Sequence, residues 1–326
     1  MRAITIAEPG DPSVLTVSDV AELAVGPGEV AIEVVAAGVN RADLLQRQGL
    51  YAPPAGESAI PGLEVSGRIK ETGAGVTSFS VGDEVCALLT GGGYAETVVV
   101  SAEQVLPVPA GLDLVDAAGL PEVVCTVFSN VFMSAGLHPG EWLLVHGGGS
   151  GIGTAAIQIT KALGGHVAVT AGSSHKLDFC RELGADVTIN YREQDFVQEI
   201  KGASDGRGAD VILDVMGAKY LERNIESLNV SGRLVIIGLQ GGRKSEIDLN
   251  EVMRRRLAVI GTTLRARPAA EKATIVAAVR EQVWPLIEDG SVLPIIHSRL
   301  AFDQAPEAHQ ILEDGENIGK VLLVKG

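Results

Sequence analysis

The sequence predicts an α/β protein in which a β-rich region accompanies a doubly wound, parallel, six-stranded sheet. Its length of 326 residues suggests roughly two domains. In residues 1–121, short β-branched runs are separated by Gly and Pro, which is the spacing of an all-β region. After Pro121, strand-like runs alternate with amphipathic stretches, which is the pattern of the strand–helix–strand units that build a parallel sheet.

The β-rich region is expected to hold short strands and one short helix. The strands are predicted at Ala3–Ile6, Val30–Val35, Glu64–Ile69, Asp83–Leu88 and Ala95–Val100. Asn40 can cap the stretch that follows it, and Gly49 can end that stretch. We therefore expect a helix over Asn40–Gln48.

The parallel sheet is expected to hold six strands joined by helical crossovers. The strands are predicted at Trp142–His146, His166–Ala171, Val187–Asn190, Asp210–Val215, Arg233–Gly238 and Leu257–Thr262. The helices between them are predicted at Gly151–Leu163, Ser174–Leu183, Glu193–Lys201, Tyr220–Leu228 and Leu249–Arg256. Several of these strands are apolar throughout, as strands covered on both faces are.

The last part of the chain leaves this alternation. It predicts one long helix over Ala269–Asp289, a strand at Ile295–Leu300, a helix near Asp303–Glu313 and a strand at Lys320–Val324. Because these strands do not extend the alternating pattern, we expect them to return to the first domain. The predicted arrangement is a substrate domain of residues 1–121 and 266–326, a nucleotide-binding domain of residues 122–265, and an active site between them.

Composition excludes several classes of function. Lys and Arg number 26 against 41 Asp and Glu, and the net charge of −15 repels nucleic acids and anionic lipid surfaces. Cys86, Cys125 and Cys180 lie far apart, so no disulfide framework or CxxC motif is expected, and a reducing cytoplasm fits best. The N-terminus has no signal-peptide pattern, and no uncharged apolar run approaches the roughly 20 residues of a membrane span.

A glycine-rich turn follows the first predicted strand of the parallel sheet. Residues 145–156 read VHGGGSGIGTAA, so a buried strand enters a glycine cluster and then a helix. A pyrophosphate can reach backbone N–H groups and the positive end of a helix only where no side chain intervenes. The strict GxGxxG fingerprint is absent, and tight packing of an ordinary strand–helix turn is the alternative interpretation.

The second predicted strand indicates which dinucleotide binds. An NAD site usually carries Asp or Glu at the end of this strand, about 20 residues beyond the turn, and residues 169–176 contain no carboxylate. Ser173 and Lys176 can instead donate to a 2′-phosphate, and Tyr191 can add a hydroxyl. The sequence therefore favours NADPH, although Ser173 could be only a helix cap and Lys176 only a solvated residue.

Motifs spread along the chain carry a family resemblance. They are Ala37–Asp43, Arg47–Tyr51, Pro61–Gly67, Gly91–Glu96, Gly147–Gly153 with Gln158 and Lys161, and Asn317–Val321. Together they make the chain resemble the zinc-independent quinone oxidoreductases, the zeta-crystallin-like branch of the medium-chain dehydrogenase/reductase superfamily. The resemblance runs essentially end to end. It implies a GroES-like β domain into whose sequence a Rossmann domain that binds NADPH is inserted. It also implies that the protein is a homodimer.

The resemblance also implies site residues. The cofactor-binding positions are Asn40, Thr126, Leu264, Arg265 and Asn317 near the nicotinamide, Gly148, Ser150, Gly151 and Ile152 along the pyrophosphate, Gly217, Gly238 and Leu239 beside the ribose, and Ser173, Lys176 and Tyr191 near the 2′-phosphate. The catalytic candidates are Tyr51, Asn40 and Ser150. Tyr51 would face the substrate. Ser150 stands where many members have glycine, which leaves a hydroxyl near the cofactor or the substrate.

No metal is expected. Zinc-dependent relatives carry a Cys after the Ala-Gly of the first motif and a His in the Gly-His-Glu of the second. This chain has Val39 and Leu63 there, and it has no cluster of cysteines, so nothing can hold Zn²⁺ in a tetrahedral site.

The expected function is NADPH-dependent reduction of a quinone in the interdomain cleft. No nucleophilic triad or carboxylate pair stands out, so the cofactor must carry the chemistry, by one- or two-electron transfer. Tyr51 can stack on a flat substrate and donate to its carbonyl, although it could simply cover the nearby helix. Asn40 could be only a helix cap, Arg265 only a solvated residue, and His146 a packing residue.

Two other functions stay open. One is reduction of an activated carbon–carbon double bond in an enoyl thioester or alkenal, with Tyr51 as proton donor. The other is a non-catalytic, crystallin-like protein that binds NADPH.

Overall fold

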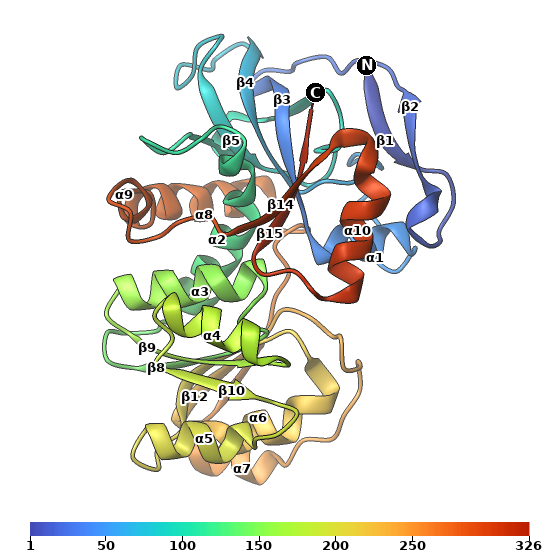
Figure 1. Ribbon diagram of the computed structural model, residues 1–326. Helices are drawn as coiled ribbons and strands as arrows, with labels where there is room; N and C mark the ends of the chain where they lie inside the picture. The colour runs from blue at the N-terminus through green and yellow to red at the C-terminus, as the bar shows by residue number, and fades with distance from the viewer. Residues whose placement is uncertain (326) are drawn as a thin grey trace. The chain divides into compact units, whose positions relative to one another are not determined.

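The computed structural model describes residues 1–325, which divide into two compact units (Figure 1). Unit 1 comprises Met1–Cys125, Leu264–Asp289 and the segment from Pro294 onward. Unit 2 comprises Thr126–Thr263 and Gly290–Leu293.

Unit 2 is built on a six-stranded sheet in the order β10-β9-β8-β11-β12-β13, and every strand pair in it is parallel. The strands are β8 (Trp142–His146), β9 (His166–Ala171), β10 (Val187–Asn190), β11 (Ala209–Asp214), β12 (Leu228–Ile236) and β13 (Ala258–Gly261). Strands β8, β9 and β11 are buried along almost their whole length. The prediction of a doubly wound parallel sheet is therefore confirmed.

Helices cover both faces of this sheet. They are α3 (Gly151–Ala162), α4 (Ser174–Glu182), α5 (Phe196–Ala203), α6 (Leu221–Ser227), which follows the 3₁₀ turn η5 (Gly217–Tyr220), and α7 (Leu249–Arg255). Helices α3 and α4 lie on one face and α5, α6 and α7 on the other (Figure 1). This arrangement follows from right-handed crossovers that leave β8 in opposite directions along the sheet.

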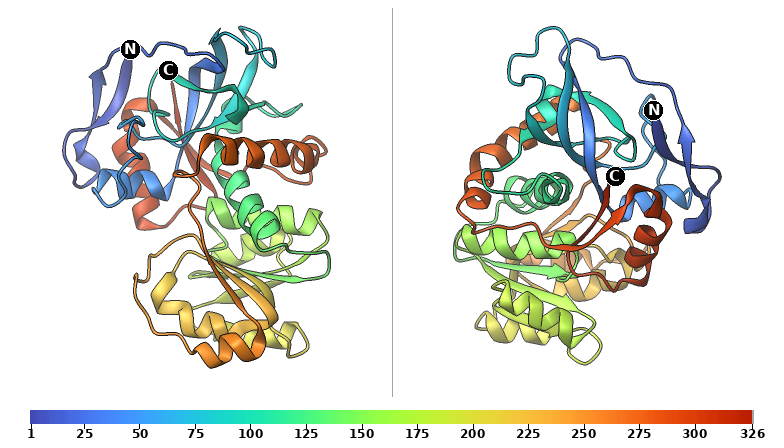
Figure 2. Two further views of the ribbon diagram at one scale, coloured as in Figure 1. Left: turned by 180° about the vertical axis from the view of Figure 1, so that it is seen from behind. Right: turned by 45° about the horizontal axis from the view of Figure 1, so that its top comes forward.

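Unit 1 contains a seven-stranded sheet and a separate hairpin. The sheet runs β14-β15-β3-β4-β5-β7, with β6 paired to β3. The strands are β3 (Glu29–Val39), β4 (Glu64–Thr72), β5 (Glu84–Leu88), β6 (Thr97–Ser101), β7 (Val105–Pro107), β14 (Ile296–Ala301) and β15 (Lys320–Val324). β15 pairs antiparallel with β3, so the last strands of the chain do join the sheet of the first domain. The hairpin of β1 (Arg2–Ile6) and β2 (Leu15–Asp19) flanks this sheet (Figure 2).

The helices of unit 1 include one clear departure from prediction. They are α1 (Arg41–Arg47), α8 (Ala269–Gln282), α9 (Trp284–Glu288) and α10 (Ala305–Asp314), with 3₁₀ turns η1 (Pro12–Val14), η2 (Ala102–Gln104) and η6 (Phe302–Gln304). The single helix expected over Ala269–Asp289 is broken at Val283. Pro285 lacks the N–H that a continuous helix needs, and it stands in the first turn of α9 instead.

A helical stretch that the sequence analysis did not predict runs over Asp116–Ser134. It consists of the 3₁₀ turn η3 (Asp116–Gly119), α2 (Pro121–Val127) and a π-helical segment η4 (Phe128–Ser134). By length and composition it could cross a membrane, but 78% of its most apolar window is buried inside the protein. That degree of burial is typical of the core helix of a globular protein.

Gly67 on β4 provides a test of strand packing. A Cβ atom there would lie 2.0 Å from the Glu33 carbonyl oxygen on β3, and a backbone atom cannot move aside cheaply. Gly67→Ala should lower the free energy of unfolding by about 2 kcal/mol. Gly202→Ala on α5, where a Cβ atom meets nothing within 4 Å, should raise it by about 0.5 kcal/mol. Urea denaturation measures both values, and equal effects would contradict the packing argument.

Candidate functional site

The predicted nucleotide-binding residues of unit 2 lie mostly in the loops at one edge of its sheet. Because all six strands are parallel, their carboxyl ends share this edge. Gly148, Ser150, Gly151 and Ile152 follow β8, Ser173 and Lys176 follow β9, Tyr191 follows β10, Gly217 follows β11, and Gly238 and Leu239 follow β12. Strand order reverses at β8, which lies between β9 and β11, and ligands of doubly wound sheets bind at this switch point. Thr126 is elsewhere, buried on α2.

The turn after β8 and the start of α3 leave no room for a Cβ atom at two positions. A Cβ atom at Gly148 would lie 2.6 Å from Val169 Cβ, and one at Gly153 would lie 2.4 Å from the carbonyl oxygens of Gly147 and Gly148. The absence of a Cβ atom at these two positions lets the turn pack against β9 and lets the first turn of α3 pack against the turn. The N–H groups of Gly147 and Gly148 donate to the Thr170 carbonyl. The first turn of α3 thus lies at the edge of the sheet, and the N–H groups at a helix N-terminus form a common type of phosphate-binding site.

Ser150 caps helix α3. Its hydroxyl donates to the Gly147 carbonyl (2.7 Å) and accepts from the Gly153 N–H (3.1 Å). Its one hydrogen is therefore already committed within the turn. The structure gives Ser150 a structural role in the turn, and a catalytic role for it stays a prediction.

Ser173, Lys176 and Tyr191 form a polar cradle around two glycines. Ser173 is exposed at the N-cap of α4, yet its side chain makes no capping hydrogen bond. The Lys176 Cδ atom lies 3.1 Å from where a Gly149 Cβ would be, and the Tyr191 hydroxyl 2.5 Å from where a Gly172 Cβ would be. The Lys176 stem and the Tyr191 hydroxyl thus flank backbone that lacks side chains, and Ser173 follows Gly172 directly.

A buried polar network supports the same edge. The His146 ring bonds Thr170 Oγ1 through Nδ1 (3.1 Å) and Asn224 Oδ1 through Nε2 (2.7 Å), and burial lowers its pKa to about 4. The ring is therefore neutral at neutral pH, and its predicted packing role agrees with this position. Asp214 accepts from the N–H groups of Met216 and Gly217 (2.8 and 2.9 Å) and so fixes the turn after β11.

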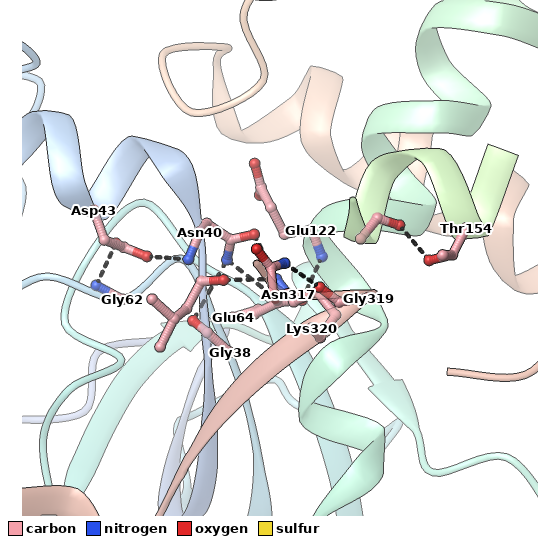
Figure 3. A network of polar contacts seen from close by, with 12 residues as sticks. Gly38, Asn40, Asp43, Gly62, Glu64, Glu122, Thr154, Asn317, Gly319 and Lys320 are labelled. Carbon is pink, nitrogen blue, oxygen red and sulfur yellow. Dashed lines mark hydrogen bonds and ion pairs between the residues drawn. The ribbon is translucent and has the colours of Figure 1, made fainter. Parts of the chain in front are cut away.

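In unit 1, Asn40 belongs to a buried ionic network (Figure 3). Glu64 Oε1 lies 2.6 Å from Lys320 Nζ and accepts from Asn40 Nδ2 (2.8 Å), while Lys320 also donates to Asn40 Oδ1 (2.6 Å). Glu64 Oε2 accepts from the Glu122 N–H (2.9 Å). Asn40 does lie at the N-cap of α1, but its side chain is held by this network rather than by the helix.

Asp43 is a second buried carboxylate in this part of unit 1. Its oxygens accept from the N–H groups of Asn40 (2.8 Å) and Gly62 (2.9 Å). Burial raises its pKa to about 6, and these two hydrogen bonds oppose the rise. Asn40 and Asp43 therefore link α1 to the loop before β4.

Arg265 and Tyr51 lie together, with Arg265 Cζ 5.4 Å from the centroid of the Tyr51 ring. Arg265 is only 3% exposed, and its Nε donates to the Thr90 carbonyl (2.7 Å). Neither Nη atom has a hydrogen-bond partner among residues 1–325. Lys272 is also buried and donates to Thr90 Oγ1. The interpretation of Arg265 as a solvated residue is therefore wrong, and its two buried donors can receive a ligand oxygen.

Glu122, at the start of α2, has an unusual carboxyl group. Among residues 1–325, nothing donates a hydrogen bond to this carboxyl and no cation pairs with it, and the residue is only partly buried. Burial raises its pKa to about 8, and the nearby Glu64 raises it further than Lys320 lowers it. Glu122 was not singled out from the sequence, because its character comes from neighbours brought together by folding.

The structure thus divides the predicted site residues between the two units. Unit 1 holds Asn40, Tyr51, Leu264, Arg265 and Asn317, whose Nδ2 donates to the Gly319 carbonyl (2.7 Å). Unit 2 holds the remaining ones. Glu64 and Lys320 fell within recognised motifs, yet only the fold shows that they pair. Among residues 1–325, no three His, Cys, Asp or Glu side chains gather as a metal site would need.

Comparison with known proteins identifies the family. The model of the alcohol dehydrogenase GroES-like domain matches residues 26–110, and the model of zinc-binding dehydrogenases matches residues 151–280. A quinone oxidoreductase of Rattus norvegicus is 33% identical over 99% of this chain and 98% of its own.

Solved structures show the same likeness. The Escherichia coli quinone oxidoreductase, solved with NADPH, superposes with a TM-score of 0.86 at 27% identity over 99% of this chain and 100% of its own. The CurK enoyl reductase superposes with a TM-score of 0.88 and is 26% identical, and the match covers 100% of this chain and 99% of its own. These matches confirm the GroES-like and Rossmann architecture, and the chain belongs to the quinone oxidoreductase branch of the medium-chain dehydrogenase/reductase superfamily.

Proposed function

We propose that this protein is an NADPH-dependent quinone reductase that works without a metal. The observation that carries the proposal is the cradle of Ser173, Lys176 and Tyr191 beside the glycine turn, because it offers donors and no carboxylate to a 2′-phosphate. Similarity to quinone oxidoreductases over nearly the whole chain supports the choice of substrate class.

The residues present fit a metal-free reaction. Val39 and Leu63, where zinc-dependent relatives carry ligands, are buried and apolar. Glu64 is already bonded to Lys320 and Asn40. When bound, NADPH supplies a hydride, and a quinone is electron-poor enough to accept it without Lewis-acid activation.

The chain's own residues bind and orient the acceptor. The half-buried Tyr51 ring offers a surface on which a flat substrate can stack. The two unpartnered Nη atoms of Arg265 offer donors to a substrate oxygen and stabilise the negative charge that develops on it. Burial of Arg265 strengthens this interaction, because little water competes for it.

Reduction of an activated carbon–carbon double bond is the second candidate. The superposition with the CurK enoyl reductase favours it, and the same Arg265 donors would accept the carbonyl oxygen of an enal or an enoyl thioester.

A kinetic screen separates these functions. Quinones and 2-enals are offered with NADPH and with NADH, and dinucleotide oxidation is followed by its absorbance. We expect turnover with quinones and NADPH. Rapid turnover with 2-enals and none with quinones would replace the first proposal by the second. Tight NADPH binding without turnover of any acceptor would indicate a non-catalytic protein.

Lys176 should set the preference for NADPH. Lys176→Ala removes an ammonium worth about 1.5–3 kcal/mol to a phosphate, so KM for NADPH should rise about 10- to 100-fold while KM for NADH stays unchanged. Lys201→Ala on α5, which covers the other face of the sheet, should change neither constant. Equal losses for NADH and NADPH would contradict the assignment.

We also propose a cytoplasmic homodimer that forms through β13. This strand ends the sheet of unit 2, Val259 on it is 43% exposed, and Met253 on the neighbouring α7 is 73% exposed. An open, apolar edge strand is a template for pairing with a second copy. The three buried, unpaired cysteines suit a reducing compartment.

Charge on this edge should prevent dimer formation. Val259→Lys should convert the dimer to a monomer in analytical ultracentrifugation while the far-ultraviolet circular dichroism stays unchanged. Leu293→Lys, which places the same charge at an exposed apolar position away from β13, should leave the dimer intact. A Val259→Lys variant that remains dimeric would place the interface elsewhere.

A further inference from the structure

Glu64, Asp43 and Glu122 of unit 1 are near enough to interact electrostatically, and only Glu122 has a carboxyl group without a hydrogen bond among residues 1–325. Glu64 is bonded at both oxygens, by Lys320 and Asn40 at Oε1 and by the Glu122 N–H at Oε2. Asp43 is likewise bonded at both oxygens. The Glu122 carboxyl has no such partner in residues 1–325, and its side chain turns away from Glu64 and Lys320 (Figure 3).

The groups around Glu122 favour its protonated form. Glu64 on β4 and Asp43 on α1 repel its charge, whereas Lys320 on β15 and Arg265 attract it. Glu122 in turn acts on Tyr51 and on Lys272 of α8. Burial is the largest cause, and with these charges it brings the pKa of Glu122 to about 8. These causes together favour the protonated form of the Glu122 side chain near neutral pH.

Arg265 is an independent sign that a ligand binds here. A buried guanidinium with two unpartnered Nη atoms carries a cost that an oxygen acceptor would remove. Its Nε is fixed to Thr90, and the Tyr51 ring lies beside it. Arg265 and Glu122 also interact electrostatically, so a substrate oxygen bound by Arg265 would lie near the Glu122 carboxyl.

We propose that Glu122 is the acid that protonates the reduced substrate, an inference that rests on the reductase activity proposed above. The substrate accepts a hydride from NADPH at an electrophilic carbon, and the displaced π electrons form an anion whose oxygen is held by Arg265. The O–H bond of the Glu122 carboxyl breaks, and its proton joins that anion. Water then returns a proton to the Glu122 carboxylate.

Glu122 suits this role better than Tyr51. Burial raises the pKa of the Tyr51 hydroxyl above its ordinary value of 10, so that hydroxyl releases its proton reluctantly. A general acid works best when its pKa lies near the operating pH, and the Glu122 carboxyl meets this condition. Tyr51 then serves for stacking, and the proton-donor role considered for it passes to Glu122.

The test compares Glu122→Gln, Tyr51→Phe and Glu57→Gln with the wild-type enzyme, using a quinone and a 2-enal. Glutamine keeps the shape of Glu122 but carries no acidic proton. With the acceptor that the wild type reduces, Glu122→Gln should lower kcat at least about 100-fold and leave the Kd for NADPH unchanged. Wild-type kcat should fall about tenfold per pH unit above pH 8, because the acid is then ionised, and this decline should vanish in Glu122→Gln.

Two controls complete the design. Tyr51→Phe should keep the alkaline decline and lose only a few-fold in kcat. Glu57→Gln removes an exposed carboxylate that also acts on Arg265 and Lys272, and it should behave as the wild type. Infrared spectroscopy of the cofactor-free protein gives a readout that requires no turnover. The carboxylic-acid band of the wild type should disappear as the pH rises through about 8, and Glu122→Gln should lack this band at every pH.

The outcomes separate the two proposals. A wild type that turns over no acceptor overturns the reductase function itself. A working wild type together with a Glu122→Gln variant that loses less than tenfold in kcat, or keeps the alkaline decline, overturns only the role of Glu122. If the alkaline decline in kcat is lost in Tyr51→Phe instead, Tyr51 and not Glu122 is the proton donor.

Discussion

The buried ion pair between Glu64 and Lys320 organises the chemical part of unit 1. Removing two charges from water is expensive, so such a pair persists only where further hydrogen bonds satisfy it. Here the pair holds the Asn40 side chain from both ends and fixes the first N–H of α2. Lys320 also attracts the charge of Glu122 while Glu64 repels it, and the repulsion is the larger of the two effects.

Unit 2 depends on a steric constraint rather than on charge. Gly148 lets the turn after β8 pack against Val169 of β9, and Gly153 lets the first turn of α3 pack against the backbone of that turn. That packing places the start of α3 at the edge where all six strands end, and the Thr170 carbonyl fixes the turn through two N–H groups. Polar groups from the neighbouring loops then surround a space that is lined by backbone.

The sequence was most informative where periodicity is strong and local. Strands β8, β9, β10 and β15 begin and end at the predicted residues, because short, largely apolar runs bounded by turns leave little choice. The break at Val283 was missed because the apolar pattern continues through it, and the helical stretch before Ser134 was missed because no cap marks it. The role of Glu122 and the burial of Arg265 could not be read from the sequence, since both depend on residues far along the chain.

The burial of the three cysteines bears on how the protein would tolerate its proposed substrates. Quinones and enals are electrophiles that alkylate thiolates, and a thiol must ionise and be reachable before it reacts. Cys86, Cys125 and Cys180 are all buried, and burial raises the pKa of each, that of Cys180 to about 11. Burial therefore protects all three thiols against alkylation by the proposed substrates.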